Sequence, residues 1–172
     1  GVRVNSFLTG DQTDPALTTL ANGTLVMLWR SDTPGQGDTS GSGIKGRILD
    51  ADGIQVTPEF LVNATTAGDQ ELPTVTALAG GGFVASWQTR NGSDTDVVAR
   101  IFDAAGTAVG SDIAINSLTT GDQGAPDLSA LPGGGFIAIW GSDTPAQGDT
   151  SGAGIKARVF DAAGVEVRAE AL

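Results

Sequence analysis

The residues best suited to hold a metal ion lie in polar loops that follow three tryptophans, Trp29, Trp87 and Trp140. Carboxylate, hydroxyl and carbonyl oxygens in glycine-rich turns are the hard ligands that Ca²⁺ prefers. Each loop carries two aspartates, and these are the candidate ligands: Asp32, Asp38, Asp94, Asp96, Asp143 and Asp149. The sequence therefore predicts Ca²⁺ as the cofactor. The alternative is that these aspartates cap turns through local hydrogen bonds.

Neither of two familiar calcium motifs supports this prediction. The sequence contains no EF-hand loop and no Gly-Gly-x-Gly-x-Asp nonapeptide, the repeat that winds calcium-binding β-rolls. A calcium ion takes six or more oxygen ligands, and each loop offers only two charged side chains.

A Gly-Asp-Gln triplet that occurs three times is the second candidate site. Aspartate and glutamine hydrogen-bond sugar hydroxyls well, so the triplets predict a ligand site presented once per copy. Its residues are Asp11, Gln12, Asp69, Gln70, Asp122 and Gln123. The alternative is structural: each aspartate pairs with a recurring arginine (Arg47, Arg100 or Arg158), or ties one unit to the next.

These residues recur because the chain is one unit written three times. After each Gly-Asp-Gln come a proline, a tryptophan and then an Arg-x-x-Asp-x-x-Gly stretch, and successive triplets are 58 and 53 residues apart. A period of this size is typical of stacked supersecondary units. We expect a single repeat domain over residues 1–172, with repeats at 4–61, 62–114 and 115–172.

Each unit has the pattern of two β-hairpins. In the middle copy the first hairpin joins residues 74–78 to 83–87, and the second joins 97–102 to a strand that begins at 107. The second strand of each unit is apolar on both faces, as in residues 25–29. A strand of this kind must be covered on both faces. No segment has the sustained 3.6-residue period of a helix.

These patterns predict an all-β fold of three four-stranded repeats packed as β-propeller blades. A β-trefoil is the alternative, because it also has three repeats of four strands. Three blades would form a very tight ring, so we consider half of a six-bladed ring, completed by a second chain, or a piece of a longer array. Residues 2–5 match 113–116 and residues 169–172 match 111–114, which places both ends in a fourth strand.

The composition excludes several kinds of chemistry. Cysteine, histidine and tyrosine are absent, which removes disulfides, thiol and imidazole catalysis and the tyrosine nucleophile of sialidases. The formal net charge of −11 argues against nucleic acid and against an anionic membrane surface. The sequence shows neither a signal peptide nor an apolar run of membrane-spanning length, so we expect no membrane insertion.

Residues 62–70, with Pro73, residues 80–84 and Trp87, resemble a repeat of large secreted bacterial proteins. These proteins are grouped with the repeats-in-toxin (RTX) and haemolysin-type calcium-binding proteins. The closing residues 154–164 are similar to the same repeat. Lysine occupies positions 45 and 156, where the family often has tyrosine. The resemblance implies export, calcium dependence and a role in adhesion or extracellular assembly, and it identifies no ligand.

From these features we expect a secreted or cell-surface, non-catalytic binding or adhesion module, lectin-like and supported by calcium. Its partners would be an extracellular glycan or protein surface and further copies of itself in a homo-oligomeric ring. Catalysis needs an asymmetric set of different groups, whereas identical repeated sites favour multivalent binding, so we expect no enzyme. A purely structural surface-layer or filament subunit is the alternative, and a glycan-acting enzyme fragment is the third hypothesis.

Overall fold

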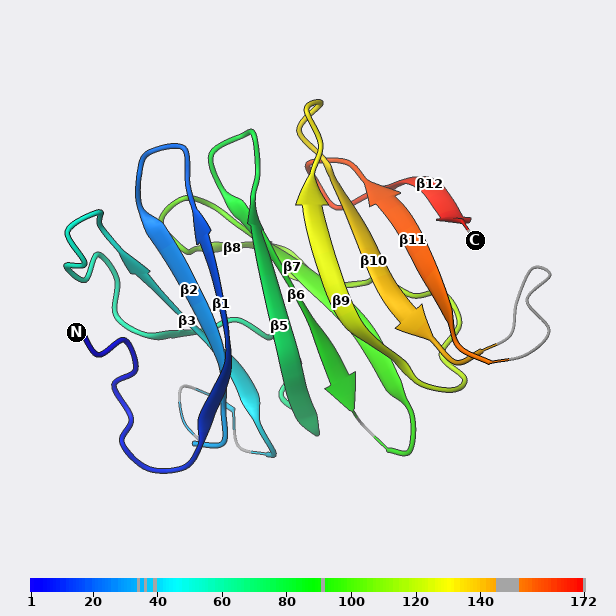
Figure 1. Ribbon diagram of the computed structural model, residues 1–172, viewed down its shortest axis with the longest axis horizontal. Coiled ribbons are helices and arrows are strands. Elements are labelled where there is room, and N and C mark those ends of the chain that lie inside the picture. The colour runs from blue at the N-terminus through cyan, green and yellow to red at the C-terminus, as the bar shows by residue number, and fades with distance from the viewer. Residues whose placement is uncertain (34, 36, 39, 91, 145–151, 172) are drawn as a thin grey trace.

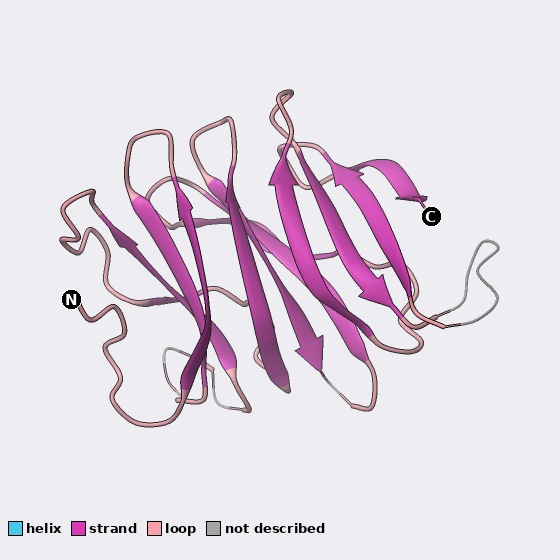
Figure 2. Ribbon diagram, in the orientation of Figure 1, coloured by secondary structure: helices cyan, strands magenta, loops and turns pink. Residues whose placement is uncertain are grey.

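The computed structural model describes residues 1–33, 35, 37–38, 40–90, 92–144 and 152–171, with side chains up to residue 167. These residues form three four-stranded antiparallel sheets (Figures 1 and 2), which we call blades 1, 2 and 3. Blade 1 contains β1 (Gln12–Thr19), β2 (Leu25–Ser31), β3 (Gly43–Leu49) and β4 (Phe60–Leu61). Blade 2 contains β5 (Asp69–Ala77), β6 (Phe83–Arg90), β7 (Thr95–Phe102) and β8 (Ala108–Ala114). Blade 3 contains β9 (Gln123–Ala130), β10 (Phe136–Ser142), β11 (Gly154–Phe160) and β12 (Glu166–Ala171).

The strands of each blade follow one another in sequence order, joined by tight turns. In blade 2 the β5–β6 turn closes with Gly81, at a φ of 96°, donating its N–H to the Leu78 carbonyl at 3.0 Å. The β7–β8 turn is held by Asp103, whose Oδ1 accepts N–H groups from Ala105 and Thr107. Asp50 and Asp161 hold the matching turns. The recurring Asp-x-x-Gly is therefore a turn signal that uses a local side-chain hydrogen bond.

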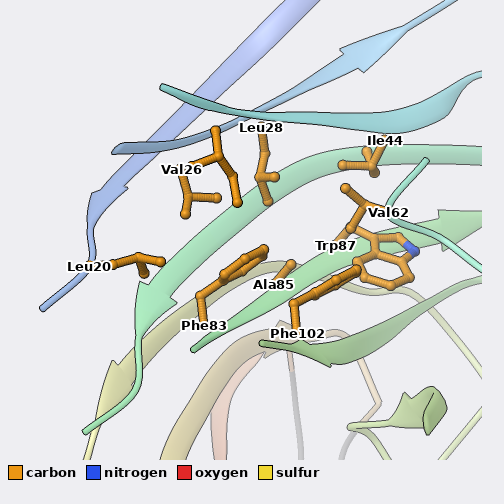
Figure 3. Packing of buried hydrophobic residues seen from close by; sticks show 10 residues of the cluster. Leu20, Val26, Leu28, Ile44, Val62, Phe83, Ala85, Trp87 and Phe102 are labelled. Carbon is orange, nitrogen blue, oxygen red and sulfur yellow. The ribbon is translucent and has the colours of Figure 1, made fainter. Parts of the chain in front are cut away.

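The hydrophobic core consists of two layers, each lying between two neighbouring blades. Figure 3 shows the first layer, where Val26, Leu28 and Ile44 of blade 1 lie opposite residues of blade 2 that include Phe83 and Trp87. The second layer packs residues of blade 2 that include Val84 and Val97 against blade 3. Burial of side chains of this size stabilises the fold by roughly 1.5–3 kcal/mol each.

The first strands of the blades, β1, β5 and β9, lie next to one another, and β5 also contacts β2 and β3 of the preceding blade. We call these three the inner strands. Sheets packed face to face around adjacent inner strands are β-propeller blades, so the predicted all-β, propeller-type fold is confirmed, and the β-trefoil alternative is wrong. The blades lie side by side, with the N- and C-terminal ends at opposite ends of the long dimension (Figure 1). No described segment forms a helix able to cross a membrane.

Candidate functional site

Two of the predicted calcium ligands, Asp38 and Asp96, serve the same purpose in blades 1 and 2. Asp96 of β7 accepts a hydrogen bond from Asn116 Nδ2 at 2.6 Å. In blade 1 the matching strand position is Gly43, and a Cβ atom there would lie 2.5 Å from the Asp38 carboxylate. Asp38 thus enters this space from the loop and accepts from Asn63 Nδ2 at 3.2 Å. Both carboxylates bind the asparagine that ends the fourth strand.

The remaining loop aspartates are held by other groups. Asp32 pairs with Arg30 at 2.9 Å. Asp94 accepts from Ser93 and from the Gly121 N–H, and the Ser93 hydrogen bond lowers the pKa of this exposed carboxyl. Asp143 donates its backbone N–H to the Asp122 carbonyl. Asp149 lies outside the described residues. The described residues contain no group of three or more acidic side chains placed to hold a metal ion, and calcium stays a prediction.

The aspartates of the Gly-Asp-Gln triplets join each blade to the one before it. Asp69 Oδ1 accepts from the Ser42 N–H at 3.0 Å, at the residue that precedes β3. Asp122 Oδ1 accepts from both the N–H and the hydroxyl of Thr95, each at 3.1 Å, at the start of β7. Asp11 is exposed, and within the described part of the chain its carboxylate has no partner. These bonds favour the structural interpretation, while the sugar-binding role stays a prediction.

The glutamines of the triplets lie deeper in the protein. Gln12 accepts from Trp29 Nε1 at 3.0 Å and Gln123 accepts from Trp140 Nε1 at 3.1 Å, so the recurring tryptophan and glutamine satisfy each other. Gln70 instead accepts from Asn63 Nδ2 at 2.9 Å. Gln70 and Gln123 are fully buried, which leaves Gln12 the most accessible of the three.

The recurring arginines do not pair with the triplet aspartates, contrary to the sequence-based interpretation. Each donates to a backbone carbonyl at the end of the preceding fourth strand or its equivalent: Arg47 to Val4, Arg100 to Val62 and Arg158 to Ile115. Their acidic neighbours come from the outer edge of their own blade: Glu59, Asp112 and Glu166. The sequence pattern missed these partners because their spacing from the arginine is not constant.

A site that sequence reasoning missed lies where the three inner strands converge. A pocket of about 270 Å³ is lined there by Asp14, Pro15, Leu72, Pro73, Ala125 and Pro126. We call it the axial pocket. Its three non-proline residues occupy one repeat position and have positive φ, between 49° and 52°. Side chains at such angles cost of order 1–3 kcal/mol each, and strain of this kind clusters at functional sites.

The axial pocket is the asymmetric part of an otherwise repetitive molecule. The residue immediately before the positive-φ position is Thr13 in blade 1, Glu71 in blade 2 and Gly124 in blade 3. The Glu71 carboxylate lies 3.6 Å from Arg30 Nε of blade 1, and Arg30 also binds Asp32. Beyond the prolines, Asp127 of β9 accepts from Thr74 of β5 at 3.4 Å. Of the inner-strand carboxylates near this pocket, only Asp14 lines it. Glu71 precedes the lining residue Leu72 and Asp127 follows the lining residue Pro126, and none of the three recurs at its position in the other blades.

Comparison with known proteins identifies the class of fold. No family model and no curated protein matches the chain. An α-L-arabinofuranosidase from Lactobacillus brevis matches 92% of this chain and 52% of its own, at 10% identity and a TM-score of 0.58. A GH43 endo-arabinanase from Bacillus licheniformis matches 90% and 56%, at 19% identity and a TM-score of 0.53. An endo-arabinase from Bacteroides thetaiotaomicron matches 98% and 66%, at 14% identity and a TM-score of 0.56.

The chain therefore has the fold of propeller-type glycoside hydrolases and spans between 52% and 66% of the length of these three. This finding corrects the prediction of a non-catalytic binding or adhesion module, and with it the prediction that the chain is not an enzyme, because the solved structures that share its fold are glycoside hydrolases. The sequence argument erred by weighing only residues that recur in every repeat. The inner-strand residues that follow the triplets differ between repeats. They supply the asymmetric set of groups that catalysis needs. The RTX-like resemblance is not tested by these comparisons and stays a prediction.

Proposed function

We propose that this chain carries the active site of a glycan-acting propeller enzyme, with the substrate lying across the axial pocket. The observation that carries the proposal is a pocket lined by non-equivalent residues, the carboxylate of Asp14 among them, on a fold shared with glycoside hydrolases. Arabinose-containing polysaccharides are the substrate class that the solved neighbours favour. Action on an extracellular glycan fits the export predicted from the sequence, which is likewise a proposal.

Hydrolysis of a glycosidic bond by most glycoside hydrolases needs two carboxyl groups, one to protonate the leaving oxygen and one to act as base or nucleophile. Asp14 lines the pocket, and Glu71 directly precedes the pocket residue Leu72 on the adjacent inner strand. We assign this pair to the reaction. Arg30, in contact with both Glu71 and Asp32, positions the Glu71 side chain at the joint between blades 1 and 2. The pocket walls include three prolines, whose backbone nitrogens have no hydrogen to donate: Pro15, Pro73 and Pro126.

The test is release of reducing sugar from a panel of polysaccharides that includes linear and branched arabinan. Asp14→Asn and Glu71→Gln should each lower the rate by about 100-fold or more, because a positioned acid or base typically contributes 10²–10⁴-fold. Asp52→Asn is the matched control: it removes the same charge from an exposed outer turn and should leave the rate unchanged. Failure of the wild-type chain to cleave any polysaccharide, or full activity in both pocket variants, would overturn the proposal.

A further inference from the structure

Blade 3 leaves one of its two faces uncovered. Ile139 is 40% exposed and Ile155 is 69% exposed. At the position of Ile155, blades 1 and 2 have Ile44 and Val97, which are both fully buried against the next blade. Ile137, Ile139 and Ile155 together form what we call the tail face. Its residues match those that form the blade-to-blade joints, and no blade among the described residues covers them.

Blade 1 leaves the opposite kind of face uncovered. Pro15, Leu17 and Met27 line a pocket of about 440 Å³ that also includes Val4 and Asn5. Leu17 is 61% exposed, whereas Val75 at the same position of blade 2 packs against the first core layer. Pro15, Leu17 and Met27 form what we call the head face. It is the surface that, in blades 2 and 3, packs against the preceding blade.

Two polar links recur at each internal joint, one within the earlier blade and one across the joint. The first joins the asparagine that ends a fourth strand to the third strand of the same blade: the Ile44 N–H donates to Asn63 Oδ1 at 2.9 Å, and the Val97 N–H to Asn116 Oδ1 at 2.7 Å. The second joins the triplet aspartate of the next blade to the start of that third strand: Asp69 to Ser42, and Asp122 to Thr95. A further joint of the same design would therefore need both halves of each link.

The two ends of the molecule carry the two partners of each link, the asparagine and aspartate acceptors at the head and the backbone N–H donors at the tail. Asn5 and Asp11 stand at the head, and within the described residues neither Asn5 Oδ1 nor the Asp11 carboxylate has a partner. Arg47 already binds the Val4 carbonyl, as Arg100 binds that of Val62, so Asn5 is presented as in the internal joints. At the tail, the pairing of β11 with β12 ends at Ala157 and Ala171. Among the described residues, Ile155 has no pairing partner in β12.

We propose that the head face of one copy binds the tail face of a second copy of this chain. Residues 4–5 then continue the outer strand of the partner's blade 3, with Asn5 Oδ1 accepting from the N–H of the partner's Ile155. Asp11 accepts from the N–H of the partner's Ala153; the alanine lacks the hydroxyl that Ser42 and Thr95 supply, so this link is the weaker of the two. The contact is heterologous, so repeated addition gives a closed ring or an open chain of copies.

Molar mass by light scattering across a concentration series, in about 0.15 M salt to screen the net charge of −11, tests the contact. We expect the mass to rise to a whole multiple of the 17.2 kDa chain. A mass that stays at one chain throughout the series overturns the proposal.

Two variants distinguish this contact from any other self-association. Leu17→Glu places a charge on the head face and Ile155→Glu places one on the tail face. Each variant alone should lose the self-association that the wild-type chain shows. A mixture of the two should form a one-to-one complex, because each variant keeps the face that the other lacks. Val109→Glu, at an exposed site on the outer strand β8 of the central blade, is the control and should associate like the wild type. All three residues are more than half exposed, so the variants are expected to fold, which circular dichroism verifies.

Association of either single variant alone at wild-type strength, or failure of the mixture to form the complex, would exclude the head-to-tail contact. A head-to-head contact would leave Ile155→Glu fully associated, and a tail-to-tail contact would leave Leu17→Glu fully associated. The readout is mass alone, so the result does not depend on whether the axial pocket hydrolyses a glycan.

Discussion

At the scale of single residues, the same structural need is met by different sequence positions. Asn63 and Asn116 each bind a carboxylate, but Asp96 stands on the strand whereas Asp38 arrives from a loop five residues before Gly43. Asp38 is only 3% exposed and also attracts the Lys45 ammonium, which opposes the lowering of the Lys45 pKa by burial. Sequence comparison of the repeats could not pair Asp38 with Asp96, because the two are not aligned.

This exchange predicts a rescue. Asp38→Ala should destabilise the protein by about 1–3 kcal/mol, because it removes an acceptor from the side chain of buried Asn63 and from the Ser40 N–H. Gly43→Asp alone should also destabilise, because its Cβ would lie 2.5 Å from the existing carboxylate. The double variant should lose much less than the sum of the two, because it recreates the arrangement of Asp96. Urea unfolding of the four proteins measures the coupling.

One result of this double-mutant cycle would contradict the prediction. Strictly additive losses would show that Asp38 and the Gly43 position do not share one space. Asp52→Asn, on an exposed turn, serves as the control for a lost charge and should change the unfolding free energy by less than about 0.5 kcal/mol.

At the scale of elements, the predicted hairpins are present, but several strands are longer than predicted. The sequence placed a strand at 74–78, whereas β5 covers Asp69–Ala77 and continues through Pro73. A proline cannot donate to a strand ladder, so the pattern alone suggested a boundary there. The structure resolves this conflict with a register shift between Glu71 and Thr74 and with Leu72 at a φ of 49°. No signal in the residue type of Leu72 predicts a positive φ.

The candidate site could be predicted from the sequence only where it recurs. Repetition identified the triplets correctly as a feature of every unit, and the structure shows Asp69 and Asp122 fastening adjacent blades. Repetition could not predict the axial pocket, because Asp14, Leu72 and Ala125 share a repeat position but differ in side-chain chemistry. Locating it required knowing that the inner strands converge.

The triplet aspartates allow a comparison of matched variants. Asp69→Ala should cost about 1–3 kcal/mol, because it leaves the buried Ser42 N–H without an acceptor. Asp11→Ala changes the same repeat position where the carboxylate is exposed and has no partner among the described residues, so it should cost less than about 0.5 kcal/mol. Chemical unfolding at low protein concentration, where copies do not associate, measures both. Equal losses would mean that the aspartate acts within its own blade and does not join blades.

At the scale of the whole molecule, stability depends on joints between neighbours, as in other repeat proteins. Blade 2 has a neighbour on each face, whereas blades 1 and 3 have one each. Ser86 of β6 is fully buried, while Ile139 at the matching position of β10 is 40% exposed. The strands β6 and β10 have the same place within their blades, hydrogen-bonded on both sides, so only the packing of the faces distinguishes them.

Native-state hydrogen exchange should therefore rank the blades by the number of joints they make. Opening β6 disrupts both core layers, whereas opening β10 disrupts one, so amides of β6 should exchange more slowly than the matching amides of β10. At low concentration the difference should be clear in peptides covering 83–90 and 136–142. At concentrations where the head face binds the tail face of another copy, β10 should gain protection and approach β6. Protection that is equal in the two strands at every concentration would mean that the three blades open as one cooperative unit.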